Sequence, residues 1–224
     1  MDRYRFSLYG NELKPSYARM AARWQDMFTK QFEYDPNEPY DLSLKPNPYL
    51  GNEFGLMDVV RDGAGEPISV DSGVMIGTVR MGFGHYRIAM AGMSAARAMG
   101  YTPLWLDLLG IPGIPSDVIN WWNTNYSKYS RLSQRSELFN KYVWESVTTG
   151  HRTLPGLWWL LNNTATGFPW RFLKANARDY RKSELFGPLH RALPPEMPML
   201  TSHMWNCMGA VAGGMINVVD MMFD

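Results

Sequence analysis

The sequence predicts an α/β domain, a Rossmann-like parallel sheet with helices on both faces, behind an N-terminal extension that is helical and irregular. Hydrophobic periodicity changes from strand-like to helical across the Gly-rich turn at 82–85, inside the stretch 74–109. The strands on either side are near-continuously apolar, as is typical of parallel strands covered on both faces. Residues 199–222 repeat the order of strand, small-residue helix and strand. We expect about four parallel strands, a half-sized doubly wound domain.

The N-terminal extension is predicted to span residues 1–66. Ser16 is expected to cap a helix, because apolar residues recur at helical spacing as far as Phe32. Residues 34–55 are crowded with Pro and Asn and are expected to form a long irregular connection. Residues 56–61 and 67–70 flank a turn at 62–65 and predict a hairpin.

The α/β domain is predicted to span residues 67–224. After the central strand, helix and strand, a Gly- and Pro-rich break at 110–115 precedes a helix that Ser116 is expected to cap. Helical pieces follow, and then a strand at 199–203, a helix at 205–214 and a strand at 215–222. Because the last strand stops almost at the last residue, we expect the chain to be cut before a second domain.

Composition excludes several classes of function. The net charge of +1 implies no global attraction to nucleic acid. One cysteine, Cys207, excludes an internal disulfide and a multi-cysteine metal site, and it is expected to be buried and inert. No apolar signal core or uninterrupted membrane span is present, and a reducing, cytoplasmic compartment is the simplest interpretation.

The turn Gly82-Phe83-Gly84-His85 lies where open α/β sheets bind ligands, between the carboxyl end of a strand and a helix N-terminus. As a dinucleotide fingerprint the match is poor, since the third glycine would fall at Arg87. Asp107 does lie near the end of the second strand, where an acidic residue would hold a ribose. A dinucleotide-binding oxidoreductase is therefore kept as an alternative.

His85 is the candidate catalytic residue, because a neutral imidazole in the crevice can accept a proton from a hydroxyl nucleophile. The alternative is a histidine that caps the turn by bonding to backbone. Arg87 can pair with a phosphate or carboxylate, and the alternative for it is a salt bridge, for example to Asp107. His203 fits a strand end, and a histidine satisfied by backbone at a helix start explains it equally well. His151 and His190 are interpreted as surface or structural residues.

These motifs resemble the acceptor-side half of GT-B glycosyltransferases, above all the monogalactosyldiacylglycerol synthase type. The resemblance lies in the Gly-rich turn with His and Arg, the Asp107-Leu108 pair, an aromatic insertion at 120–129, and Thr201-Ser202-His203 before a small-residue helix. It covers residues 74–222. Met81 and Phe83 stand where the family carries further glycines, and the donor-binding second domain has no counterpart here.

The resemblance implies a hexosyltransferase that moves a sugar from a nucleotide-sugar to a hydroxyl of a lipid-like acceptor. His85 would be the general base, with Gly82, Phe83, Gly84, Arg87, Asp107 and His203 around the substrates. The nucleotide-sugar would be a co-substrate, and neither a cofactor nor a metal would be required. The donor half would come from a missing C-terminal domain or from a partner chain. The alternative from another class is a non-catalytic binding or scaffold half.

A second surface is predicted where bulky aromatics adjoin a basic helix face. The aromatics are Trp158 and Trp159, and the basic residues are Arg171, Lys174 and Arg178. This combination suits the surface of an anionic membrane, and hence a peripheral location. A core helix with a solvated basic side is the alternative, and no nucleic-acid partner is expected because the overall charge is balanced.

Overall fold

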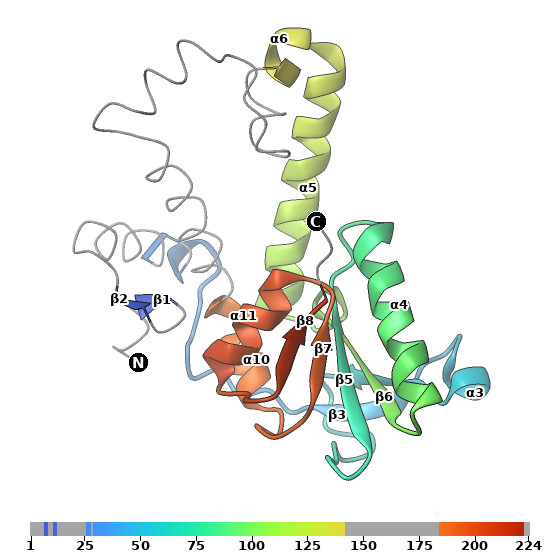
Figure 1. The fold of residues 1–224 in the computed structure, drawn as a ribbon. Coiled ribbons are helices and arrows are strands. Elements are labelled where there is room, and N and C mark those ends of the chain that lie inside the picture. The colour runs from blue at the N-terminus through green and yellow to red at the C-terminus, as the bar shows by residue number, and fades with distance from the viewer. Residues whose placement is uncertain (1–6, 9–10, 13–25, 28, 142–183, 222–224) are drawn as a thin grey trace. The chain divides into compact units, whose positions relative to one another are not determined.

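The computed structural model describes residues 7–8, 11–12, 26–27, 29–141 and 184–221 (Figure 1). The chain divides into two compact units, one of Met1–Ile119 with Arg178–Asp224 and one of Asn120–Ala177. Strands β1 (Ser7–Leu8) and β2 (Asn11–Glu12) pair as a separate two-stranded ladder. The site lies in the first unit, on a six-stranded sheet.

That sheet has the order β3-β4-β6-β5-β7-β8. The pairs β4·β6, β6·β5, β5·β7 and β7·β8 are parallel, and β3 is antiparallel to β4 at the edge. The strands are β3 (Ser43–Pro46), β4 (Met57–Val60), β5 (Gly73–Thr78), β6 (Thr102–Asp107), β7 (Met199–Thr201) and β8 (Val218–Asp220). The predicted Rossmann-like α/β fold is confirmed, with five parallel strands instead of four.

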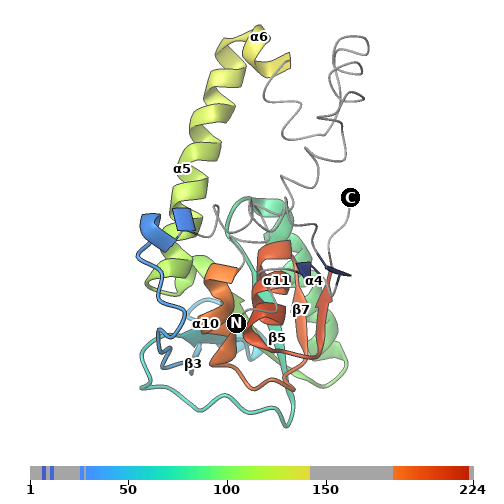
Figure 2. The ribbon, with the colours of Figure 1, turned by 90° about the vertical axis from the view of Figure 1, so that its left-hand side faces the viewer.

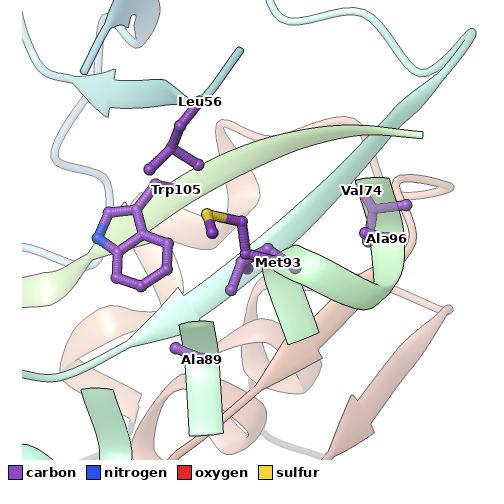
Figure 3. Close-up of a cluster of buried hydrophobic side chains, with 7 residues drawn as sticks. Leu56, Val74, Ala89, Met93, Ala96 and Trp105 are labelled. Atoms are coloured by element: carbon purple, nitrogen blue, oxygen red, sulfur yellow. The ribbon is translucent and has the colours of Figure 1, made fainter. Parts of the chain in front are cut away.

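Helix α4 (Phe83–Ala98) covers one face of the sheet. Side chains alternate between the two faces of a strand, so Val74 and Ile76 of β5 point the same way. Both belong to one buried cluster with Met93 of α4 and Trp105 of β6, shown in Figure 3. Its other members are Leu56, Ala89 and Ala96. The small residues of α4 thus let the helix lie close to the central strands.

Helix α11 (Met204–Gly213) covers the opposite face, with α10 (Gly187–Arg191) beside it. A Cβ atom added at Gly77 of β5 would lie 2.5 Å from Met199 Cε and 3.1 Å from Asn206 Cγ of α11. Glycine at this position is therefore what lets α11 approach the central strand. Figures 1 and 2 show α4 on one side of the sheet and α10 and α11 on the other.

The segment before β5 differs from its prediction. The Pro-rich stretch 34–55 contains strand β3 and the short helix α3 (Gly51–Phe54), and β3 pairs with β4 in the main sheet. The predicted hairpin between 56–61 and 67–70 is therefore wrong, since β3 is the antiparallel partner of β4 and 67–70 forms no strand. Most of the helix predicted from Ser16 lies outside the described residues, although 26–27 and 29–31 are helical.

The chain after β6 passes through the 3-10 turn η1 (Leu108–Gly110) into α5 (Ile114–Arg135) and α6 (Glu137–Phe139), and η3 (Glu184–Phe186) precedes α10. Ser116 does not cap α5, because the helix already begins at Ile114 and the Ser116 hydroxyl donates to the Gly113 carbonyl over 2.9 Å. Across the described part of the chain, no helix combines the length and the apolar character needed to cross a membrane.

Candidate functional site

The carboxyl ends of β5 and β7 meet where the chain turns to opposite faces of the sheet. After β5 it enters α4 on one face, and after β7 it enters α11 on the other. Ligands of open α/β sheets bind in the crevice at such a switch point. The two helix starts that flank it here carry His85 and His203.

A buried polar cluster ties the ends of these two strands together. The Ser202 N–H donates to the Gly77 carbonyl over 2.9 Å, and the Ser202 hydroxyl donates to the Thr78 hydroxyl over 3.2 Å. The Asn206 side-chain amide donates to the Thr78 carbonyl over 2.9 Å. Thr78, Ser202 and Asn206 have no exposed surface. These bonds tie the end of β5 to Ser202 and to the first turn of α11, whereas the side-chain oxygen of Asn206 is buried without a hydrogen-bond partner among the described residues.

His85 is half-buried in the first turn of α4, and its Nδ1 lies 2.6 Å from the Ser202 carbonyl oxygen. A carbonyl can only accept, so Nδ1 carries the proton of this bond. In the neutral ring the lone pair is therefore on Nε2. The alternative that His85 bonds to backbone is therefore confirmed, but the partner is the Ser202 carbonyl just after β7 and not the turn that contains His85. This bond orients the imidazole and defines Nε2 as its basic atom.

His203 caps α11, since its Nδ1 accepts the N–H of Trp205 over 3.1 Å. In the neutral ring the proton is then on Nε2. The rings of His203 and His85 meet edge to face, with centroids 4.6 Å apart. Burial, followed by the charge of His85, lowers the pKa of His203 to about 3. His203 is thus a neutral hydrogen-bond donor at physiological pH.

Asp220 lies at the end of β8, opposite Thr201 of β7. Its carboxylate accepts the Thr201 hydroxyl over 2.8 Å. Burial raises the pKa of Asp220, whereas the Thr201 bond and the charge of His85 lower it. Cys207 lies in the first turn of α11, and burial, followed by the charge of Asp220, raises the pKa of its thiol to about 11. The prediction that Cys207 is buried is wrong, because this residue is only half-buried.

On the β6 side of the same crevice, Arg80 and Asp107 form an ion pair. Asp107 also accepts the N–H of Leu109 over 3.0 Å. Burial raises the pKa of Asp107, although the neighbouring guanidinium acts in the opposite direction. The alternative of a salt bridge between Arg87 and Asp107 is wrong, because Arg80 makes that contact and Arg87 is exposed.

A pocket of about 330 Å³ opens next to this ion pair, lined by Arg80, Gly82, Phe83 and Tyr86. Phe83 is 85% exposed, and Tyr86 packs edge to face on Trp105 with ring centroids 5.3 Å apart. Gly82 and Phe83 were expected at the site from the sequence, whereas Arg80 and Tyr86 were not. His85 is not among the residues that line this pocket.

The two glycines of the turn have different roles. Gly82 has φ 150° and ψ 167°, a conformation open essentially to glycine alone. Gly84 has no such backbone requirement, and a Cβ atom added there would meet nothing within 4 Å. No side chain caps α4 at Gly82, so the first N–H groups of the helix are left to solvent or to a ligand.

The remaining predicted residues fall in different places. Trp158, Trp159, Arg171, Lys174 and Arg178 lie outside the described residues, as does His151. His190 is fully buried, its Nδ1 is 2.8 Å from the Phe186 carbonyl, and burial lowers its pKa to about 4. Within the described residues, no group of three or more His, Cys, Asp or Glu side chains could hold a metal ion.

Sequence reasoning missed Arg80, Tyr86 and Asp220. Arg80 and Tyr86 flank the glycines that were recognised, so their proximity in the chain was an available signal. Asp220 carried none, because the contact of its carboxylate with the Thr201 hydroxyl depends on the pairing of β7 with β8.

The chain matches a protein family over residues 7–224. That family is described as a domain of unknown function, DUF6937. The chain belongs to it. No curated protein and no solved structure matches this DUF6937 chain.

Proposed function

We propose that this chain is the acceptor-activating half of a hexosyltransferase, with His85 as the general base. The observation that supports it is the bond from His85 Nδ1 to the Ser202 carbonyl, which leaves Nε2 as the proton acceptor at the carboxyl edge of the sheet. A half-buried imidazole whose orientation and tautomer are fixed by backbone has the geometry that general-base catalysis needs.

In the proposed reaction an acceptor hydroxyl gives its proton to His85 Nε2 as its oxygen attacks the anomeric carbon of the donor. The new bond joins that oxygen to the sugar, and the bond from the sugar to the nucleotide diphosphate breaks. The diphosphate leaves with the electron pair, and His85 later returns its proton to solvent.

The substrates divide between two halves. The nucleotide-sugar is held by a donor-binding domain, either in a partner chain or in a further domain, and the acceptor is a lipid-like hydroxyl compound. The pocket beside Phe83 and Tyr86 has the aromatic walls that such an acceptor would contact. A peripheral contact with a membrane, through the surface around Trp158 and Arg171, remains a prediction.

The dinucleotide-binding alternative is less favoured. Its ribose contact would require the carboxylate of Asp107, which is already engaged by Arg80 and by the Leu109 N–H. A non-catalytic scaffold half needs no base, and the fixed tautomer of His85 favours the catalytic proposal over it.

The test is transfer of labelled hexose from UDP-glucose or UDP-galactose into extractable lipid, in lysates of the organism that encodes the chain, so that the donor-binding half is present, with its own copy of the gene deleted and the full-length chain supplied on a vector. We expect incorporation above the empty-vector level with the wild type, and a fall of about 10²–10⁴-fold with His85→Ala, because general-base catalysis contributes about that factor. Asp71→Asn, on an exposed loop before β5, is the matched control. Wild-type incorporation at the empty-vector level, or an unchanged rate in His85→Ala, would contradict the proposal.

A further inference from the structure

The pocket at the start of α4 combines two aromatic rings with one charged side chain. Its volume is about 330 Å³, and its lining residues are Arg80, Gly82, Phe83 and Tyr86. Phe83 is 85% exposed, whereas Tyr86 is half-buried and packs on Trp105. Aromatic walls with a small number of polar groups are typical of pockets that bind small molecules.

The charge of this pocket is balanced by the protein itself. Arg80 supplies the positive charge of the lining and forms an ion pair with Asp107. The side chain of Arg80 is 54% exposed, whereas that of Asp107 is only 11% exposed. A guanidinium has five N–H donors in a fixed fork, so it can pair with a carboxylate and donate to a ligand at the same time. The pocket therefore offers hydrogen-bond donors without a net charge.

Three classes of ligand differ in how they fit these walls. An anion would be attracted by Arg80 but repelled by the neighbouring Asp107 carboxylate. A hydrocarbon chain would pack on Phe83 and Tyr86, but it would remove water from the guanidinium without replacing the hydrogen bonds. A sugar ring is uncharged, its hydroxyls accept hydrogen bonds from a guanidinium, and its C–H groups pack on the negative face of an aromatic ring. The sugar ring fits both kinds of wall.

We propose that this pocket binds a sugar ring of the acceptor, so that the acceptor is a lipid that already carries a sugar. Phe83 covers one face of the ring, and Arg80 donates to its hydroxyls. Since His85 does not line the pocket, the bound ring is a part of the acceptor separate from the reacting hydroxyl. The inference rests on the proposed function for the role of acceptor, whereas sugar binding itself requires neither a donor nor transfer.

The test is binding of methyl β-D-glucopyranoside and methyl β-D-galactopyranoside to the full chain, measured by saturation-transfer NMR and by titration. We expect at least one of the two glycosides to bind with a Kd in the millimolar range. Saturation should be strongest on the C–H protons of one ring face, because that face lies against Phe83. Glycerol, which has hydroxyls but no ring, should bind more weakly.

Variants at Phe83 locate the bound sugar. Phe83→Leu keeps an apolar side chain and removes the flat ring, so it should weaken glycoside binding by about threefold to tenfold. Phe83→Tyr keeps the ring and should bind as the wild type does. Tyr49→Leu is the matched control, because Tyr49 is 86% exposed and does not line the pocket. Arg80→Lys keeps the charge beside Asp107 but loses the fork of donors, and it should also weaken binding.

Several results would overturn the inference. They are the absence of glycoside binding in the wild type, unchanged binding in Phe83→Leu, and an equal loss in Tyr49→Leu. Binding of inorganic phosphate without binding of either glycoside would indicate an anion site and would overturn it too. Glycoside binding without any hexose transfer rejects only the proposed reaction. Transfer that depends on His85 and proceeds into a lipid without a sugar, in a chain that binds no glycoside, rejects only the sugar site.

Discussion

Two helices begin next to each other at the carboxyl edge of the sheet, and their first turns are built differently. Helix α11 is capped by the ring of His203, which accepts the N–H of Trp205 and is buried. Helix α4 starts at Gly82 with no side-chain cap, and Phe83 beside it is exposed. The start of α11 is satisfied by its own chain, whereas the start of α4 is open. We therefore assign a structural role to the first and a ligand-contacting role to the second.

The largest expected effect is a loss of folding stability at low pH, caused by the two buried histidines His190 and His203. Burial lowers the pKa of His190 to about 4 and the pKa of His203 to about 3, whereas the ordinary pKa of histidine is 6.5. Below pH 6.5 the unfolded chain therefore binds protons at these two rings that the folded chain does not bind. Each ring should therefore lower the free energy of unfolding by up to about 1.4 kcal/mol per pH unit as the pH falls from 6.5 toward 5. Urea unfolding at pH 7, 6 and 5 measures this slope.

His203→Asn keeps a side chain that can cap α11 and removes the titratable ring, because asparagine is also a good N-cap but does not titrate. We expect the slope between pH 6.5 and 5 to fall by about half, since one of two buried rings is lost. The carboxyls of Asp107 and Asp220 have raised pKa values and act with the opposite sign, because the folded chain binds their protons more readily. Both carboxyls are present in the wild type and in His203→Asn, so an unchanged slope in the variant would show that the His203 ring is not buried.

The next effect concerns how tightly α11 is packed. A Cβ atom at Gly209 would lie 2.8 Å from Phe186 Cβ and 3.0 Å from His190 Cε1. Gly209→Ala should therefore lower the free energy of unfolding by about 1–3 kcal/mol, the usual cost of overpacking, despite the better helix propensity of alanine. Thermal or urea unfolding checks the change. A more stable variant would mean that α10 and α11 are further apart than the structure has them.

The elements around these two helix starts were predictable because their signals are local. Strand β5, α4 and β6 follow one another within residues 73–107, and the hydrophobic period changes near Gly82 and again near Gly100. Strand β3 was missed because Ser43–Pro46 is short and contains Lys and Pro, residues that an edge strand tolerates. Its pairing with β4, and not its own composition, makes it a strand.

The site was predictable only in part, because only some of its residues are close to one another in the sequence. Gly82, Phe83 and His85 could be placed because they lie between a strand and a helix in the chain. The hydrogen-bond partner of His85 could not be predicted, since Ser202 is 117 residues away in the sequence. The ion pair of Asp107 shows the limit for charge, because Arg87 is nearer to Asp107 in the sequence than Arg80 is, and yet Arg80, in the loop after β5, makes the contact.

The smallest expected effect is the most informative about the open start of α4. Gly84→Ala should raise the free energy of unfolding by about 0.5–1 kcal/mol, because alanine favours the helix and the added methyl meets nothing within 4 Å. A chain that keeps glycine at such a position forgoes stability, which is explained if a ligand approaches the backbone there. Hexose transfer should then fall in the variant although the fold is more stable.

Ser94→Ala is the matched control for this comparison, since it also improves helix propensity in α4 but lies in an exposed position away from the turn. It should leave transfer unchanged. If Gly84→Ala gains stability and transfers hexose as fast as Ser94→Ala, the space above Gly84 is not used by substrate. The open turn of α4 would then be no more functional than the capped turn of α11, and the distinction between the two helix starts would concern folding alone.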